Sequence, residues 1–323
     1  MRPFDYHRPD TSDDALKLGG EEAAFIGGGT NLLDLMKLEV MTPDQLVDIN
    51  RLGLDQIDEV SGGIRIGATV RNSDLADDAR IRRNWPVLSR ALLAGASPQL
   101  RNRATTAGNL LQRNRCPYFQ DIDAPCNKRV PGSGCAAIGG ELRNHAVLGT
   151  SDQCIALHPS DMAVAMRALD AEVIIRDAGG GTRTTGLAEF YRLPGDTPHI
   201  ETTLAPGELV TAVHLPAPAG DRQIYRKVRD RASYAFALVS TAVVLRMENG
   251  KIASASLAFG GLGTQPWRDP EVEALLTGEA PSEALFDKAG ELLMRDAELR
   301  EGLEFKKPLA QRVLKAVLTE VTQ

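Results

Sequence analysis

The sequence predicts an α+β protein of two domains. Three observations support this prediction: the length of 323 residues, a break at Pro216, Pro218 and Gly220, and a final part in which long strands come before helices. At about 150 residues per domain, this length favours two domains. Strands followed by helices are typical of a small α+β domain. We therefore expect domains at 1–219 and 220–323.

Composition excludes several classes of function. The formal net charge is −6 and the pI is about 5.5, which gives no electrostatic footprint for nucleic acid. The most apolar run, Ala235–Leu245, is interrupted by Ser240 and Thr241 and is far shorter than the ~20 residues of a membrane helix. Met1 to His7 lacks the apolar core of a signal peptide, so we expect any export to depend on a partner.

The first elements lead to a glycine turn. Pro3–Arg8 is expected as an edge strand, and Ser12 as the N-cap of a short helix. Ala23–Ile26 is a short apolar strand, followed by Gly27-Gly28-Gly29 and a helix beginning near Thr30. Glycines let backbone N–H groups approach an anion closely, so the pattern predicts a pyrophosphate site. A plain strand-to-helix turn is the alternative, because G-x-G-x-x-G is absent.

The remaining elements of the first domain follow from alternation and caps. Residues 45–49 and 63–68 alternate like strands, Asn72 or Ser73 is expected to cap a helix, and 85–93 forms a helix with one apolar face. Further strands are expected at 172–176, 182–185 and 208–215. Gly179-Gly180-Gly181 joins two of these strands, so we interpret it as a hairpin turn without a ligand.

The C-terminal domain is predicted from two long alternating strands, 223–229 and 235–247, and a third at 251–259. Asn249-Gly250 is a hairpin turn between the last two. Helices are expected at 271–276, 282–294 and 308–321, and the apolar face of the last one is expected to be core.

All four cysteines fall in one long segment, residues 113–156, with the spacing C-x9-C-x8-C-x18-C: Cys116, Cys126, Cys135 and Cys154. A structureless stretch of this length is uncommon inside a domain unless it is functional or cross-linked. Two disulfides, a zinc ion or a [4Fe–4S] cluster would each cross-link it. Close Cys-x2–4-Cys pairs are missing and neither ferredoxin spacing is present, so the residues alone favour the cluster only slightly over zinc.

Three motifs then carry a family resemblance: Phe25–Leu33, Thr105–Leu110 and Pro159–Asp161. In this order they resemble the flavin motifs of the FAD-binding subunit of molybdenum hydroxylases, the xanthine dehydrogenase, aldehyde oxidoreductase and carbon monoxide dehydrogenase family. The resemblance covers essentially the whole chain. The cysteine segment makes the chain most similar to the [4Fe–4S]-containing FAD subunit of periplasmic aldehyde oxidoreductases. The FAD subunit of 4-hydroxybenzoyl-CoA reductase is a more distant relative with a similar insertion.

The resemblance implies a two-lobed FAD-binding domain of the PCMH and molybdenum-hydroxylase flavoprotein type, then a small domain with a three-stranded antiparallel sheet and helices. It also implies that the pyrophosphate lies on the backbone amides of Gly27 to Asn31. The residues that it implies for this loop are Ile26, Gly27, Gly28, Gly29, Thr30, Asn31 and Leu32.

The other implied FAD contacts are spread along the chain. Thr105, Gly108 and Asn109 would form a second loop over the phosphates, although Thr105 and Asn109 also fit as turn or cap residues. Asp161 would accept hydrogen bonds from a flavin or ribityl hydroxyl, with a helix N-cap as the alternative.

The resemblance implies two further FAD contacts from residues outside these loops. Lys227 would reach the N1–C2=O edge of the flavin from the C-terminal domain, and Leu209 would pack beside the ring. Neighbouring His158 is expected to be a satisfied structural histidine rather than a ligand.

The implied function is electron transfer within a heterotrimeric molybdenum-containing aldehyde oxidoreductase, with no catalytic residue in this chain. Electrons would come from a molybdenum cofactor on a large subunit through [2Fe–2S] clusters on a small one, and leave from FAD to an external acceptor. A stand-alone FAD oxidase of the vanillyl-alcohol oxidase type, a 4-hydroxybenzoyl-CoA reductase-like subunit and a zinc-stapled assembly protein remain alternatives. The resemblance also implies a periplasmic location by co-export, with a cytoplasmic one as the alternative.

Overall fold

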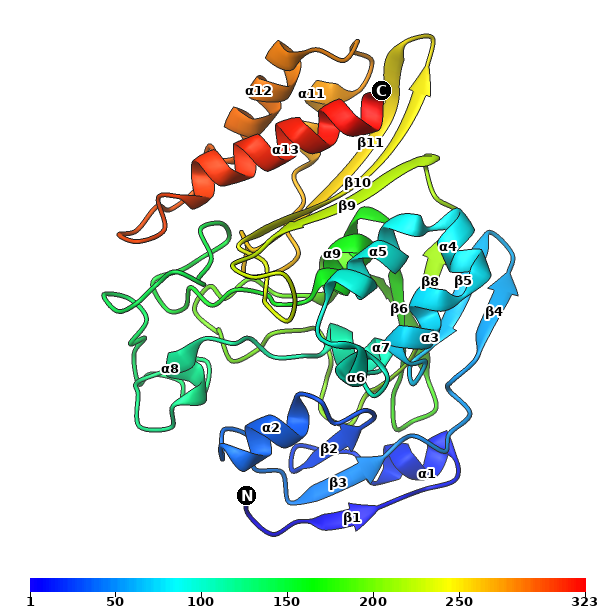
Figure 1. Cartoon of the computed structure of the whole chain (residues 1–323). Coiled ribbons are helices and arrows are strands. Elements are labelled where there is room, and N and C mark those ends of the chain that lie inside the picture. Colours follow the sequence, from blue (N-terminus) through cyan, green and yellow to red (C-terminus); the bar gives the residue numbers. More distant parts are fainter.

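A computed structural model describes all 323 residues, which form three sheets with helices packed against them (Figure 1). The first sheet is parallel and has the order β1-β3-β2. Its strands and helices are β1 (Asp5–His7), α1 (Ser12–Lys17), β2 (Ala23–Ile26), α2 (Leu32–Lys37) and β3 (Gln45–Asp48). β1 lies at the edge, as expected. The predicted cap at Ser12 is wrong by one residue, because the Thr11 side chain accepts from the Asp14 N–H.

The second sheet has five antiparallel strands in the order β4-β5-β8-β6-β7. They are β4 (Ile57–Val60), β5 (Gly63–Gly67), β6 (Glu172–Arg176), β7 (Thr182–Gly186) and β8 (Leu209–Pro216). The hairpin predicted at Gly179–Gly181 joins β6 to β7 and is confirmed. Strand β4 was not predicted.

Helices accompany this sheet and share its core of 34 buried residues. They are α3 (Asn72–Asp77), α4 (Ala79–Asn84), α5 (Pro86–Ala94), α7 (Thr106–Leu110), α9 (Asp161–Ala168) and α10 (Leu187–Phe190), whereas the short helix α6 (Pro98–Arg101) has no buried residue. The prediction of a cap at Asn72 or Ser73 is wrong, because both residues lie inside α3, whose N-cap is Arg71.

The third sheet confirms the predicted C-terminal domain. Its antiparallel strands are β9 (Arg222–Val228), β10 (Val239–Glu248) and β11 (Lys251–Gly260), and its helices are α11 (Pro270–Leu276), α12 (Glu283–Leu293) and α13 (Lys306–Thr322). Asn249 and Gly250 both have positive φ, as a tight hairpin turn requires. β10 begins four residues later than predicted, because a loop covers 229–238.

Both faces of this C-terminal sheet are buried. Successive strand residues point to opposite faces, so Ala242 and Val244 of β10 join the core of the five-stranded sheet, while Val243 and Leu245 join a second core under α11–α13. Figure 1 shows β9–β11 between α11–α13 on one side and α5 and α9 on the other. This packing brings β9 against the helices of the first domain.

The cysteine segment has little regular structure, as predicted. Within 113–156 the one helix is α8 (Pro117–Gln120), and the backbone of Cys126 bridges that of Cys135. Apolar residues of the segment pack in the core under α11–α13: Ala137, Leu142, Val147, Leu148 and Ile155. The segment that carries the thiols is therefore packed against the C-terminal domain.

Candidate cofactor sites

The turn between β2 and α2 presents unused backbone donors. The N–H groups of Gly27 to Asn31 donate no hydrogen bond within the chain. Gly29 has φ +73°, a left-handed conformation that glycine adopts without strain. Successive free N–H groups in such a turn form a concave site for an anion. The predicted glycine loop thus has the backbone geometry of a phosphate cradle.

The same turn packs tightly on the segment before α7. A Cβ on Gly28 would lie 2.0 Å from the Arg103 carbonyl oxygen, and one on Gly27 would lie 2.9 Å from Thr105 Oγ1. Only glycine lets the two loops meet this closely. The two predicted loops therefore form a single structure.

Two residues that the sequence did not predict hold these loops together. The Asn50 amide donates to the Gly27 carbonyl at 2.9 Å, and Arg71 donates to the Asn50 side chain at 2.8 Å and to the Arg103 carbonyl at 2.6 Å. Both follow strands that end beside the loops. No motif marks them, because their role depends on tertiary contacts.

In the second loop, at Thr105 to Asn109, Thr105 is a helix cap, as the alternative interpretation of the sequence predicted. Thr105 is the N-cap of α7, and its hydroxyl accepts from the Gly108 N–H at 3.2 Å. Asn109 accepts from the Ser160 hydroxyl at 2.6 Å, and Ser160 in turn caps α9. The alternative role of Asp161 as that cap is wrong, because Asp161 is the first residue of the helix and its carboxylate is free for other partners.

Asp161 joins the two domains through β9. One carboxylate oxygen accepts from the Tyr225 hydroxyl at 2.5 Å, and the other from Lys227 Nζ at 2.8 Å. The side chains of Lys227 and Asp161 are only 3% and 10% exposed. Burial raises the pKa of Tyr225, and the Asp161 charge and hydrogen bond add to the rise, so Tyr225 stays a neutral donor. Tyr225 is a site residue that the sequence did not indicate.

Every predicted FAD-binding residue lines one of two adjoining cavities. The smaller, of about 210 Å³, contains the glycine loop, Thr105 and Leu209. The larger, of about 570 Å³, contains Asn109, Asp161 and Lys227. Residues that line both are Thr30, Asn31 and Gly108. Leu209 and Lys227 therefore lie in different cavities, so they do not meet the same end of a ligand that spans both.

The larger cavity also has cations that the sequence did not predict. Arg115 donates to the Arg113 carbonyl and to Gln112, and burial lowers its pKa. Arg101 and Arg231 line the same cavity. With Lys227 paired to Asp161, these guanidinium groups are a source of positive charge along the lining of the cavity. Their scattered positions gave no sequence signal.

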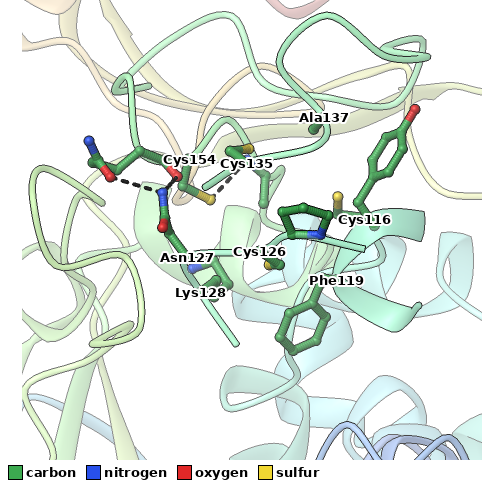
Figure 2. Close-up of a pocket in the computed structure, with 12 residues that line it drawn as sticks. Cys116, Phe119, Cys126, Asn127, Lys128, Cys135, Ala137 and Cys154 are labelled. Carbon is green, nitrogen blue, oxygen red and sulfur yellow. Dashed lines mark hydrogen bonds between the residues drawn. The ribbon is translucent and has the colours of Figure 1, made fainter. Parts of the chain in front are cut away.

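The four cysteines line one small cavity, together with Phe119, Asn127 and Lys128 (Figure 2). All four are free, so the two-disulfide alternative is not what the structure contains. Cys116 also lines the larger cavity, so the cysteine cavity and the larger cavity adjoin at this residue. The structure thus brings together side chains that are up to 38 positions apart, Cys116 and Cys154.

Burial opposes deprotonation of two of the four thiols. Burial raises the pKa of the Cys116 thiol to about 12 and also raises the pKa of Cys154, whereas the Lys128 charge opposes the rise at Cys154. Deprotonating these buried thiols needs a group that binds thiolates strongly, such as iron or zinc. His145 Nε2 lies 3.2 Å from Cys116 Sγ, and the Ala156 N–H donates to Cys154 Sγ at 3.5 Å.

The four thiols do not form a ready-made site for a single metal ion. No three His, Cys, Asp or Glu side chains lie close enough to hold one metal ion. A tetrahedral zinc with Zn–S bonds of about 2.3 Å requires such closeness. A [4Fe–4S] cluster takes its four thiolates at the corners of a wider cube. The cavity among the four thiols, of about 10 Å³, has room for about one water molecule, so the thiols would have to move apart to hold a cluster.

None of the helices combines the length and the apolar composition needed to cross a bilayer.

Residues 2–218 match the family described as the FAD binding domain in molybdopterin dehydrogenase, and residues 223–321 match the CO dehydrogenase flavoprotein C-terminal domain. The chain is thus a flavoprotein of the molybdenum hydroxylase class. It belongs to the family of FAD-binding subunits of molybdopterin dehydrogenases, which are oxidoreductases.

Individual relatives agree with this family. The chain is 56% identical to the aldehyde oxidoreductase FAD-binding subunit PaoB of Escherichia coli K12, over 99% of this chain and 98% of that protein. It is 28% identical to the glyceraldehyde dehydrogenase medium chain of Sulfolobus acidocaldarius, over 85% and 82%. A crystal structure of the Cu,Mo-CO dehydrogenase superposes with a TM-score of 0.77 at 26% identity, covering 100% of this chain and 99% of that chain.

Proposed function

We propose that this chain is the FAD- and [4Fe–4S]-binding electron-transfer subunit of a molybdenum-containing aldehyde oxidoreductase. When bound, FAD accepts electron pairs and can release them singly, whereas an iron–sulfur cluster passes one electron at a time. The observation that carries the flavin part is the row of free N–H groups from Gly27 to Asn31 at the junction of two cavities.

The two cavities suggest how FAD lies in the proposed site. The pyrophosphate would rest on the N–H groups of Gly27 to Asn31, with its charge offset by the arginines of the larger cavity. The larger cavity would hold the isoalloxazine near Lys227 and Asp161. Leu209 would then face the adenosine end, in place of the ring contact expected from the family.

The paired Asp161 and Lys227 define what the protein supplies to the flavin. Both Asp161 oxygens already accept a hydrogen bond, and each keeps a second lone pair for a flavin or ribityl hydroxyl. Because Asp161 neutralises Lys227, the pair adds a dipole rather than a full positive charge at the ring.

Cys116, Cys126, Cys135 and Cys154 would hold the cluster. Its loop, 113–156, would belong to the FAD-binding domain at 1–219, and the domain at 220–323 would close over the flavin through β9. The position of Cys116 on both cavities supports electron exchange between the two groups. None of these residues would act as a catalytic residue, because substrate oxidation belongs to another subunit.

The proposed partners are a large molybdenum-cofactor subunit and a small [2Fe–2S] subunit, supported by relatives that are named medium chains or subunits. The aldehyde substrate class is supported by the relative with 56% identity. The location proposed for the assembled complex is the periplasm. A 4-hydroxybenzoyl-CoA reductase-like enzyme or a stand-alone FAD oxidase is less well supported, since similar proteins are named as subunits or medium chains of an aldehyde oxidoreductase, of dehydrogenases and of a hydroxylase.

An absorbance spectrum with iron, sulfide and flavin analysis of anaerobically purified full-length chain tests this function. The proposal predicts one FAD and one [4Fe–4S] cluster per chain. Flavin without iron would remove the cluster, and zinc without flavin would overturn the whole proposal. Reduction of the flavin by an aldehyde in the isolated chain would favour the stand-alone oxidase.

A further inference from the structure

Asp48, the last residue of β3, is a buried carboxylate next to the glycine turn. Its Cα partner across the β2–β3 pair is Ile26, the residue directly before Gly27. Asp48 is only 6% exposed. One of its carboxylate oxygens accepts from the Asn50 backbone N–H at 2.9 Å and from the Asn50 side-chain amide at 2.6 Å.

The other carboxylate oxygen of Asp48 is held from the edge strand. It accepts from the Tyr6 hydroxyl and lies 3.4 Å from Arg8 Nε. Burial raises the pKa of Asp48, but the hydrogen bonds from Tyr6 and Asn50 and the charge of Arg8 outweigh that rise and lower the pKa, so the group is ionised near pH 7. Both carboxylate oxygens therefore have partners within the chain.

The Asn50 side-chain amide is fixed by three partners. Its NH2 group donates to Asp48 and, at 2.9 Å, to the Gly27 carbonyl, while its oxygen accepts from Arg71 at 2.8 Å. Two acceptors and one donor define a single orientation of an amide. Asp48 is the charged acceptor of the two, and a hydrogen bond to an ionised acceptor is the stronger kind. Asp48 therefore contributes most to the direction in which Asn50 points.

The Gly27 carbonyl belongs to the same peptide group as the Gly28 N–H. In a planar trans peptide the C=O and the N–H point in opposite directions, and the chain has no cis peptide bond. Because Asn50 holds the carbonyl, the Gly28 N–H points away from Asn50, and it donates to no atom of the chain. Both glycines line the smaller cavity, whereas Asp48 and Asn50 line neither flavin cavity.

We infer that Asp48 is a positioning residue for the pyrophosphate of FAD, acting through Asn50 to orient the Gly27–Gly28 peptide. This inference rests on the proposed function. Without the carboxylate, the Asn50 amide is free to rotate and the peptide loses its fixed direction. A bound anion depends on the alignment of the backbone N–H groups around it, so FAD is held less tightly when one of them turns away.

The other run of three glycines, Gly179–Gly181, shows the opposite arrangement. Asp177 follows β6, and its carboxylate accepts directly from the Gly179 N–H at 2.8 Å and from the Gly181 N–H at 3.0 Å. The Gly180 N–H donates to the Asp177 carbonyl at 3.1 Å. That turn thus uses all three glycine N–H groups internally. At Gly27–Gly29 the neighbouring carboxylate binds Asn50 instead and leaves the glycine N–H groups free.

The test compares FAD with riboflavin, which lacks the pyrophosphate, on the cofactor-stripped full-length chain. Asp48→Asn keeps the size of the side chain but is neutral and has one acceptor oxygen in place of two. We expect the dissociation constant for FAD to rise about tenfold and that for riboflavin to stay within about twofold of wild type. Asp177→Asn is the matched control at the other glycine turn and should leave both constants unchanged.

A milder variant and a double variant complete the test. Tyr6→Phe removes one partner of Asp48 at a side chain that is 54% exposed, and should weaken FAD binding about threefold with riboflavin unchanged. Asn50→Ala should weaken FAD binding by itself. Adding Asp48→Asn to it should cause no further loss, because the link through Asn50 is already absent.

Three results would overturn the inference. They are unchanged FAD affinity in Asp48→Asn, an equal loss of FAD and riboflavin affinity in that variant, and independent effects of the Asp48 and Asn50 changes in the double variant. If Asp48→Asn does not fold, Tyr6→Phe gives the same comparison, and an unchanged ratio of the two affinities there would overturn the inference. If the wild type itself binds no FAD, the proposed function fails instead.

Discussion

The flavin cavities and the cysteine cavity adjoin at Cys116 but are built differently. The flavin cavities take their donors from the backbone of short turns between regular elements, and close packing of Gly27 and Gly28 on residues 103–105 sets the geometry. The cysteine cavity takes its donors from side chains on a segment with one short helix. The first site is therefore shaped by packing alone, whereas the four thiols of the second are free and form no cross-link among themselves.

The largest effect is expected from a methyl group on the glycine loop. Gly28→Ala places Cβ 2.0 Å from the Arg103 carbonyl oxygen, so the two loops must separate and the N–H groups lose their alignment. We expect no FAD to remain bound after gel filtration. Gly20→Ala is the control, because no atom lies within 4 Å of the added Cβ and the chain should keep its FAD. Full retention of FAD by Gly28→Ala would show that the tight contact is dispensable.

Cysteine replacements test whether the two sites are separate. Cys154→Ser should abolish bound iron and sulfide yet leave about one FAD per chain, because Cys154 does not line either flavin cavity. Cys116→Ser should remove the cluster and also weaken FAD binding, since Cys116 lines the larger flavin cavity. Measuring iron, sulfide and flavin per chain in both variants shows whether the two sites are separate. Equal FAD loss in the two would contradict independent sites.

The next largest effect is expected from breaking the buried ion pair between Asp161 and Lys227, which joins the two domains. Asp161→Asn leaves Lys227 without its counter-charge, which we expect to cost about 3–5 kcal/mol of unfolding free energy. The double variant Asp161→Asn with Lys227→Met should regain part of that loss. The control is Glu320→Gln, which breaks an exposed pair between Glu320 of α13 and Arg226, the neighbour of Lys227 on β9. This change should cost less than about 1 kcal/mol of unfolding free energy. Denaturant titration measures all three, and similar losses at Asp161 and Glu320 would argue against a buried link.

The smallest effect concerns stability over the single unit from pH 7 to 8. Burial lowers the pKa of Lys306 to about 7 from 10.5, and its amino group donates to the carbonyls of His145 and Gly261. Between pH 7 and 10.5 the unfolded chain binds the proton and the folded chain does not, so stability rises with pH by up to about 1.4 kcal/mol per unit. The rise is absent below pH 7, where both states are protonated. Lys306→Met should remove this slope in denaturant titrations, and an unchanged slope would contradict the assignment.

Sequence predicted the parts of the sites whose chemistry is local. The glycine loop and the four cysteines carry their donors in their own residue types, and both converge on cavities in the structure. Asn50, Arg71 and Tyr225 escaped prediction, because an amide, a guanidinium and a phenol gain their roles only from what the fold places beside them. Leu209 lines the smaller cavity and Lys227 the larger one, and the ring contact expected for Leu209 stays a prediction.

Small boundary errors have a local cause. Thr11 and Ser12 both offer hydroxyl caps, and sequence does not show which one accepts the hydrogen bond. The same holds for Ser160 and Asp161, and there the difference matters for function: with Ser160 as the cap, Asp161 is free to bind Tyr225 and Lys227.

The central claim is that free N–H groups of the glycine loop hold a pyrophosphate. The most direct test is to titrate the cofactor-stripped full-length chain with FAD and, separately, with riboflavin, following flavin fluorescence. Riboflavin keeps the ring and ribityl chain but lacks the pyrophosphate. The account predicts that FAD binds at least 100-fold more tightly, as roughly two charge-assisted hydrogen bonds would give. Equal affinities would contradict it.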